Sequence, residues 1–271
     1  MYFDVKGKQV FASTGGKPFD HSQPVVIFLA GSGLDHTFWG LHSRFFAFRH
    51  YSVLCLDTPG HSHSEGPALT SIEALADWLN DVVLALDINA LSIVAHSQGC
   101  LVALEYAARY PERLHSLSLI TSGLATPVND HLLQAASRNP VAAVDMMIAW
   151  GFGQAGHLHQ GPIPGSSMAA VGYKTMWRNA PDALATDLKA CNDYQNGKAA
   201  AAAVQCPVQV IVAGKDRMAP AKATATLVEY LPHPRLTRVP ESGHMLPLEV
   251  PDQCRTLLKD FIFSNHPARP A

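Results

Sequence analysis

The chain has 271 residues, of which 48% are hydrophobic and 15% are charged, and its formal net charge is −2. This composition supplies enough apolar material for a large core in one domain, or in one domain with an insertion. The small net charge gives no electrostatic case for a nucleic-acid partner or an anionic membrane surface. The longest apolar runs are too short to span a bilayer, and the first ten residues lack the pattern of a signal peptide.

The cysteine content points to a reducing compartment. There are five cysteines, an odd number at wide spacing, so a disulfide framework is not indicated. We expect free, mostly buried thiols and a cytoplasmic location. The residues concerned are Cys55, Cys100, Cys191, Cys206 and Cys254.

The predicted elements alternate between apolar strands and amphipathic helices. After a hairpin around Gly7 (residues 2–13), runs typical of strands buried on both faces occur at 24–30, 51–57, 91–95, 114–120 and 207–214, with a short strand at 235–239. Helical spacing of apolar residues marks 71–87, 99–110, 222–231 and 254–263. This alternation predicts an α/β fold, with a mostly parallel sheet that helices cover on both faces.

The alternation is interrupted between about Gly123 and Val204. Helices are predicted at 129–152 and 181–194, a Gly- and Pro-rich loop at 153–168, and no buried strand. The alanine-rich residues 198–204 are expected to form a helical or linking return to the sheet. We interpret the whole segment as a helical insertion in an α/β sheet.

Ser97 lies between a predicted buried strand and a predicted helix, in the sequence Ala-His-Ser-Gln-Gly. Small residues, Ala95 and Gly99, stand two positions before and after it. A sharp strand-to-helix turn with small flanking residues can expose a strained serine at the carboxyl edge of a sheet, near a helix N-terminus. Ser97 is therefore a candidate nucleophile, and the alternative is an ordinary helix N-cap.

A serine nucleophile needs a base, and the base needs an orienting carboxylate. Asp216 follows the predicted strand 207–214, and His244 follows the predicted strand 235–239. Both positions lie at the sheet edge expected for Ser97, in the chain order serine, acid, histidine. Taken singly, Asp216 could be a turn residue and His244 a solvated loop histidine. Together they predict a Ser97–His244–Asp216 triad.

Catalysis by such a triad also needs donors for the oxyanion. The backbone N–H of Gln98, which follows the nucleophile, is one candidate. The second is expected in the glycine-rich loop after the strand 24–30, where we assign it to Ser32, with Gly33 as the alternative.

These motifs resemble the α/β-hydrolase family. The segments LAGSGLDHTFW, LDTPGHSHS, AHSQG, GKDRMAP and SGHMLPLEVP fall in the family's order and cover nearly the whole chain. Two departures are Ala30-Gly31 where the family often has His-Gly, and Cys100 where many members have a second glycine. The resemblance implies a hydrolase core at 1–123 and 205–271, and a helical cap at 124–204 that shapes the substrate pocket.

Other chemistries find less support. The alternating pairs His61 and His63, and His157 and His159, lack further ligands at metal spacing. The Gly31–His36 region lacks a dinucleotide-binding pattern. We expect no metal and no cofactor, treat Asp57 as structural, and place Cys100 in the core.

We therefore predict a serine hydrolase that cleaves a small to medium, neutral carboxylic ester. Its partner would be a small-molecule substrate, without nucleic acid or membrane, and the oligomeric state stays open, a homo-oligomer included. Carbon–carbon bond hydrolases of ring-cleavage products and non-catalytic binding members of the family remain alternatives. An aminopeptidase would need acidic cap residues, for which Asp182, Asp187 and Asp193 are available, and basic groups for an anionic substrate could come from Lys174, Arg178 and Lys189.

Overall fold

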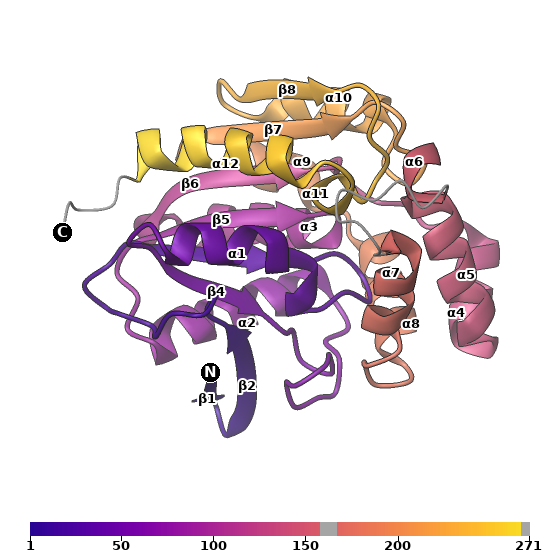
Figure 1. The fold of residues 1–271 in the computed structure, drawn as a ribbon, viewed down its shortest axis with the longest axis horizontal. Helices are drawn as coiled ribbons and strands as arrows, with labels where there is room; N and C mark the ends of the chain where they lie inside the picture. Colours follow the sequence, from indigo (N-terminus) through magenta and orange to yellow (C-terminus); the bar gives the residue numbers. More distant parts are fainter. Residues whose placement is uncertain (158–166, 267–271) are drawn as a thin grey trace.

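The computed structural model describes residues 1–157 and 167–266, and its centre is an eight-stranded sheet (Figure 1). The strand order is β1-β2-β4-β3-β5-β6-β7-β8. β1 pairs with β2 and β2 with β4 in antiparallel fashion, while all later pairs are parallel. The strands are β1 (Tyr2–Val5), β2 (Lys8–Ser13), β3 (Val25–Leu29), β4 (Ser52–Leu56), β5 (Leu91–His96), β6 (Leu114–Ile120), β7 (Val208–Ala213) and β8 (Arg235–Val239).

Helices cover both faces of this sheet, as the alternating pattern predicts. One face carries α1 (Gly40–Ala47) and α12 (Pro251–Asn265), which contact β4, β6 and each other. The other face carries α2 (Ile72–Ala85), α3 (Gln98–Arg109), α9 (Gly197–Ala202) and α10 (Ala221–Tyr230). Every residue of β3, β4, β5 and β7 is buried, because apolar layers lie above and below these strands. The α/β class and the mostly parallel, doubly covered sheet are confirmed.

A group of helices follows β6 and lies beyond one end of the sheet (Figure 1). The parallel strands point toward these helices, so the group sits over the carboxyl ends of the strands. We call residues 124–204 the cap, although α9 packs against α3 and α10 in the helical layer of the core. The other helices of the cap are α4 (Asp130–Arg138), α5 (Pro140–Gly151), α6 (Gln154–His157), α7 (Met168–Met176) and α8 (Ala183–Asp193).

Two sequence-based expectations need correction here. The helical stretch expected at 129–152 is divided into two helices, α4 and α5, because Pro140 has no N–H to continue the first one. Asn139 ends α4, and its side chain accepts a hydrogen bond from Ala142 N–H in the first turn of α5. The loop expected at 153–168 contains the short helix α6, and its residues 158–166 lie outside the described part of the chain.

The helix α1, with the short 3-10 helix η1 (His36–Trp39) before it, has no counterpart among the predicted elements. Its buried face includes the polar residues His42 and Ser43 as well as Phe46 and Ala47. This mixture conceals the apolar spacing by which a buried helix face is recognised. Within residues 1–157 and 167–266, no helix is long and apolar enough to cross a membrane.

Candidate active site

Ser97 occupies the turn between β5 and α3 in a strained backbone conformation. Its φ is 52° and its ψ is −119°, a region that non-glycine residues rarely adopt. Its side chain makes no capping hydrogen bond to α3, so the N-cap interpretation does not explain the residue. The strain is of order 1–3 kcal/mol, and it is held by a hydrogen bond from Ser97 N–H to Ile120 O at 3.1 Å.

His244 and Asp216 meet as a buried pair. The Nδ1 atom of His244 lies 2.8 Å from Oδ2 of Asp216, and the two side chains are 2% and 1% exposed. The other carboxylate oxygen, Oδ1, accepts hydrogen bonds from Met218 N–H and Ala219 N–H at 2.8 Å each. The loop after β7 therefore holds the carboxylate rigidly. An Nδ1–H donated to Asp216 leaves Nε2 of His244 without a proton and able to accept one.

The backbone of His244 is held by two residues that sequence reasoning missed. Its carbonyl oxygen accepts hydrogen bonds from His96 Nε2 at 2.9 Å and from Thr121 Oγ1 at 3.2 Å. His96 is fully buried, and burial, together with the nearby His244, keeps its pKa well below the ordinary value. A neutral His96 with its proton on Nε2 fits this role. The position of His96 next to Ser97 is the signal that could have found it.

Glu249 ties the His244 loop to the cap. Its Oε2 atom accepts hydrogen bonds from Gly243 N–H at 3.0 Å and from Gly153 N–H at 3.1 Å. Burial raises the pKa of this carboxyl group. The contact fixes the residue before His244 relative to the end of α5.

A cavity of about 370 Å³ brings several predicted residues together. Ser32, Ser97 and His244 line it from the core, whereas Gln98 is not among its lining residues. Arg217 also lines the cavity and was not singled out from the sequence. Most of the remaining wall is apolar and comes from the cap, with Val128, Leu132, Met147, Trp150 and Leu188.

The two predicted oxyanion donors lie in different segments. Ser32 is buried in the loop after β3, and no hydrogen bond within the described chain uses its backbone N–H. Gln98 is the first residue of α3, where the N–H has no partner inside the helix. The alternative donor is engaged elsewhere, because Gly33 N–H donates to Asp187 Oδ2 at 2.8 Å.

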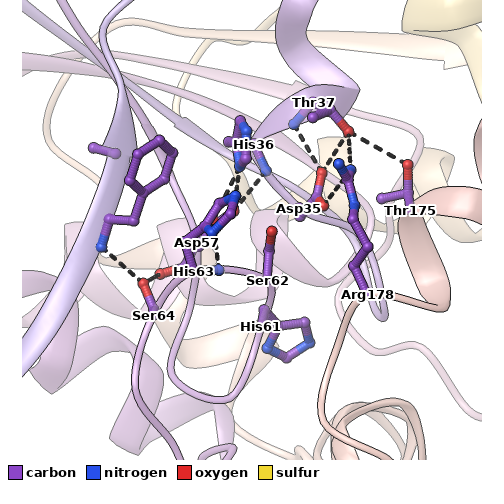
Figure 2. A network of polar contacts seen from close by, with 12 residues as sticks. Asp35, His36, Thr37, Asp57, His61, Ser62, His63, Ser64, Thr175 and Arg178 are labelled. Atoms are coloured by element: carbon purple, nitrogen blue, oxygen red, sulfur yellow. Dashed lines mark hydrogen bonds and ion pairs between the residues drawn. The ribbon is translucent and has the colours of Figure 1, made fainter. Parts of the chain in front are cut away.

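A polar network extends from this loop (Figure 2). The Nδ1 atom of His36 lies 2.9 and 3.0 Å from the two carboxylate oxygens of Asp57, and Asp35 pairs with Arg178 from the cap. Asp35, His36 and Asp57 are the one group among the described residues whose side chains could together hold a metal ion. The guanidinium of Arg178 already compensates Asp35, so the contacts are explained by hydrogen bonding and ion pairing. We assign no metal to them.

His61 and His63, the alternating histidines that follow β4, contact different partners. The ring of His63 packs against Phe11 at 4.9 Å, whereas His61 Nε2 lies 2.9 Å from Asp187 Oδ2. They do not form a common ligand set. The other alternating pair includes His159, which lies outside the described residues. All five cysteines are free, and Cys100 directs its thiol to Ala95 O, within the core.

Comparison with known proteins places the chain in a family. The model of the alpha/beta hydrolase family matches residues 26–257, so the chain belongs to that family. It is 27% identical over 233 residues to a pimeloyl-[acyl-carrier protein] methyl ester esterase of Chromobacterium violaceum, a match that covers 82% of this chain and 87% of the esterase. The structure of an enol-lactonase from Burkholderia xenovorans superposes with a TM-score of 0.86 at 20% identity, covering 97% of this chain and 99% of the lactonase.

A third relative is matched over a shorter region. The chain is 33% identical over 107 residues to an uncharacterized protein of Mycobacterium tuberculosis. That match covers 39% of this chain and 31% of the mycobacterial protein.

Proposed function

We propose that the chain is a serine hydrolase that cleaves a small to medium, neutral carboxylic ester through an acyl-enzyme. One observation carries this proposal. Ser97, in a strained turn at the carboxyl end of β5, lines the same cavity as His244, whose ring is hydrogen-bonded to buried Asp216. Membership in the alpha/beta hydrolase family supports it.

In this mechanism Ser97 Oγ attacks the ester carbonyl carbon while His244 Nε2 takes the hydroxyl proton. Asp216 keeps the Nδ1–H tautomer and stabilises the imidazolium that forms. The N–H groups of Ser32 and Gln98 donate to the oxyanion. His244 then gives its proton to the leaving alkoxide, and a water molecule repeats the sequence on the acyl-enzyme to release the acid.

The names of two similar proteins and the residues near the cavity support an ester as the substrate. One relative is named as a methyl ester esterase and one structural neighbour as an enol-lactonase, and both names describe cleavage of an ester bond. An aminopeptidase is less well supported because Asp187 is engaged by His61, Asp193 is paired with Lys189, and Asp182 is exposed and does not line the cavity. The basic groups of the cap also give little support to an anionic substrate. Arg178 is paired with Asp35, and Lys174 does not line the cavity.

A fluorophosphonate probe tests the nucleophile. We expect it to label Ser97 and no other residue, because only a base-activated hydroxyl beside oxyanion donors reacts quickly. Ser97→Ala should abolish labelling and ester turnover while the melting temperature stays equal or rises, since polar active-site residues are often kept for activity at some cost in stability. Mass spectrometry of the labelled peptide gives the answer, and label on another residue of the folded protein would exclude Ser97.

Turnover and thermal-stability assays also distinguish the two alternative functions from ester hydrolysis. A carbon–carbon bond hydrolase would turn over a ring-cleavage dienoate faster than any ester in a panel. A non-catalytic binding member would show ligand-induced thermal stabilisation without product.

A further inference from the structure

Gly33 connects Ser32, a proposed oxyanion donor, to the cap. Its φ is +69°, and it lies in a turn that a hydrogen bond from Leu34 N–H to Gly31 O closes at 3.0 Å. Both of its backbone polar groups are held from the cap. Its N–H donates to Asp187 Oδ2 at 2.8 Å, and its carbonyl oxygen accepts from Asn179 Nδ2 at 2.7 Å. Two cap side chains therefore hold the peptide next to Ser32, in addition to the hydrogen bond within the turn.

Asp187 also reaches the segment that carries the other proposed donor. Its backbone oxygen accepts a hydrogen bond from Gln98 Nε2 at 3.2 Å. One turn later on α8, the Sγ atom of Cys191 lies 3.6 Å from Ser32 Oγ, as expected for residues four apart on one helix face. A single face of α8 thus contacts the loop after β3 and the start of α3.

His61 is the buried ion-pair partner of Asp187. The two residues are 2% and 3% exposed. Nδ1 of His61 lies 2.9 Å from Thr58 Oγ1 and 3.1 Å from the carbonyl oxygen of Pro59, and Nε2 lies 2.9 Å from Asp187 Oδ2. A carboxylate oxygen only accepts, so Nε2 carries a proton and donates it to Asp187. Burial by itself would lower the pKa of His61, but the charge and hydrogen bond of Asp187 outweigh it and raise the pKa to about 9.

We propose that Asp187 is a positioning residue for catalysis: its side chain and backbone join the two segments that carry the oxyanion donors, and His61 and Asn179 complete this clamp. The inference rests on the proposed serine-hydrolase function. It makes the cap part of the catalytic geometry as well as a wall of the cavity. Because Leu188 and Cys191 of the same helix line the cavity, the helix that contacts the substrate also sets the oxyanion donors.

A loss of this clamp should affect the chemical step more than substrate binding. A donor displaced by about 1 Å can cost up to roughly 10²-fold in rate, and loss of one donor costs about 10²–10³ in kcat. We expect Asp187→Ala to lower kcat for a p-nitrophenyl ester at least about 10-fold and to change KM less than about 3-fold. Asp187→Asn, whose amide oxygen can still accept from Gly33, should recover most of the loss.

Asp193→Ala is the matched control on the same helix. Asp193 is half-exposed, pairs with Lys189 and does not line the cavity, so its removal should leave kcat and KM unchanged. If Asp187→Ala does not fold, Asn179→Ala tests the same clamp at a half-buried position through the carbonyl of Gly33. A kcat close to that of the wild type in a folded Asp187→Ala protein, or a rise in KM alone, would overturn the positioning role.

Amide hydrogen exchange makes the test independent of turnover. In the wild type the Gly33 amide should be protected by Asp187, and in Asp187→Ala the segment 31–35 should exchange at least about 10-fold faster, with residues 91–96 unchanged as the internal reference. Unchanged exchange at 31–35 would refute the clamp whether or not esters are hydrolysed. Faster exchange without any wild-type ester turnover or probe labelling would refute the proposed function and leave the clamp as a structural contact, overturning its catalytic role.

Discussion

Buried histidines in this protein have pKa values shifted in opposite directions, and their immediate partners decide which. His42 Nε2 donates a hydrogen bond to Pro247 O at 2.9 Å, and burial lowers the pKa of His42 to about 4. His96 faces the carbonyl oxygen of His244, and its pKa is likewise held well below the usual value. His61 is just as buried but faces the carboxylate of Asp187, so its pKa is raised. Burial disfavours the imidazolium, and an adjacent carboxylate reverses that preference.

The raised pKa of His61 predicts a loss of stability at alkaline pH. Its pKa is about 9 in the folded protein, against about 6.5 for an unfolded chain. Its contribution is fully present below about pH 6.5 and is lost as the pH rises through about 9. Urea unfolding should therefore give a wild-type free energy of unfolding that falls over this interval, with a shallower fall in His61→Asn. Parallel profiles for the two proteins would contradict the raised pKa of His61.

The start of α3 depends on a close approach between that helix and β3. A Cβ atom at Gly99 would lie 2.7 Å from Leu29 O and 2.8 Å from Ala30 O. These are backbone atoms of a fully buried strand and its end, so they cannot move aside cheaply. The small residue after Gln98 is therefore required by packing, and it lets α3 begin directly beneath the loop that carries Ser32.

We expect Gly99→Ala to push the first turn of α3 away from β3. Overpacking of this kind costs roughly 1–3 kcal/mol, and the displaced Gln98 N–H should lower kcat for esters. Gly40→Ala is the control, because its Cβ would meet no atom within 4 Å and its φ is −54°. Gly40→Ala should leave the melting temperature unchanged or raise it slightly. Equal melting temperatures and equal kcat for the two variants would show that the approach of α3 to β3 is unimportant.

The cavity is closed on two sides by parts of the chain that are far apart in sequence. The sheet edge contributes Ser32, Ser97 and His244, and the cap contributes an apolar wall with Leu132 and Trp150 among its members. A cavity with an apolar wall of this kind discriminates between acyl chains by length, at roughly 1–3 kcal/mol per methylene-sized mismatch. Arg217 is the one Arg or Lys among the described lining residues.

A p-nitrophenyl ester series from acetate to palmitate should therefore peak at short or medium acyl length. For these neutral esters, Arg217→Gln should change kcat/KM less than about 3-fold, since a neutral acyl group gives the guanidinium nothing to pair with. Arg238→Gln, an exposed arginine of β8, is the control for the lost charge. A steady rise to palmitate would favour a lipase. A preference for carboxylate-bearing esters that Arg217→Gln abolishes would replace the neutral substrate with an anionic one.

Local patterns along the chain were sufficient to predict the sheet, most of its covering helices and the chain positions of the proposed triad. Continuous apolar runs mark buried strands, and a short polar motif at the end of such a run marks the edge where Ser97, Asp216 and His244 lie. These signals involve residues that are close together in the sequence, so they can be recognised without the tertiary structure. They failed where local spacing was mixed, as in α1, or where one proline divided a helical pattern, as at Pro140.

Contacts between distant segments could not be predicted in this way. Nothing near Asp187 in the sequence indicates that it would meet His61, Gly33 and Gln98, which lie 89 to 154 positions away. The same holds for the hydrogen bond of His96 to His244 and for Glu249 between Gly153 and Gly243. A buried polar group must find a partner wherever the fold places one, and folding chooses that partner by proximity in space.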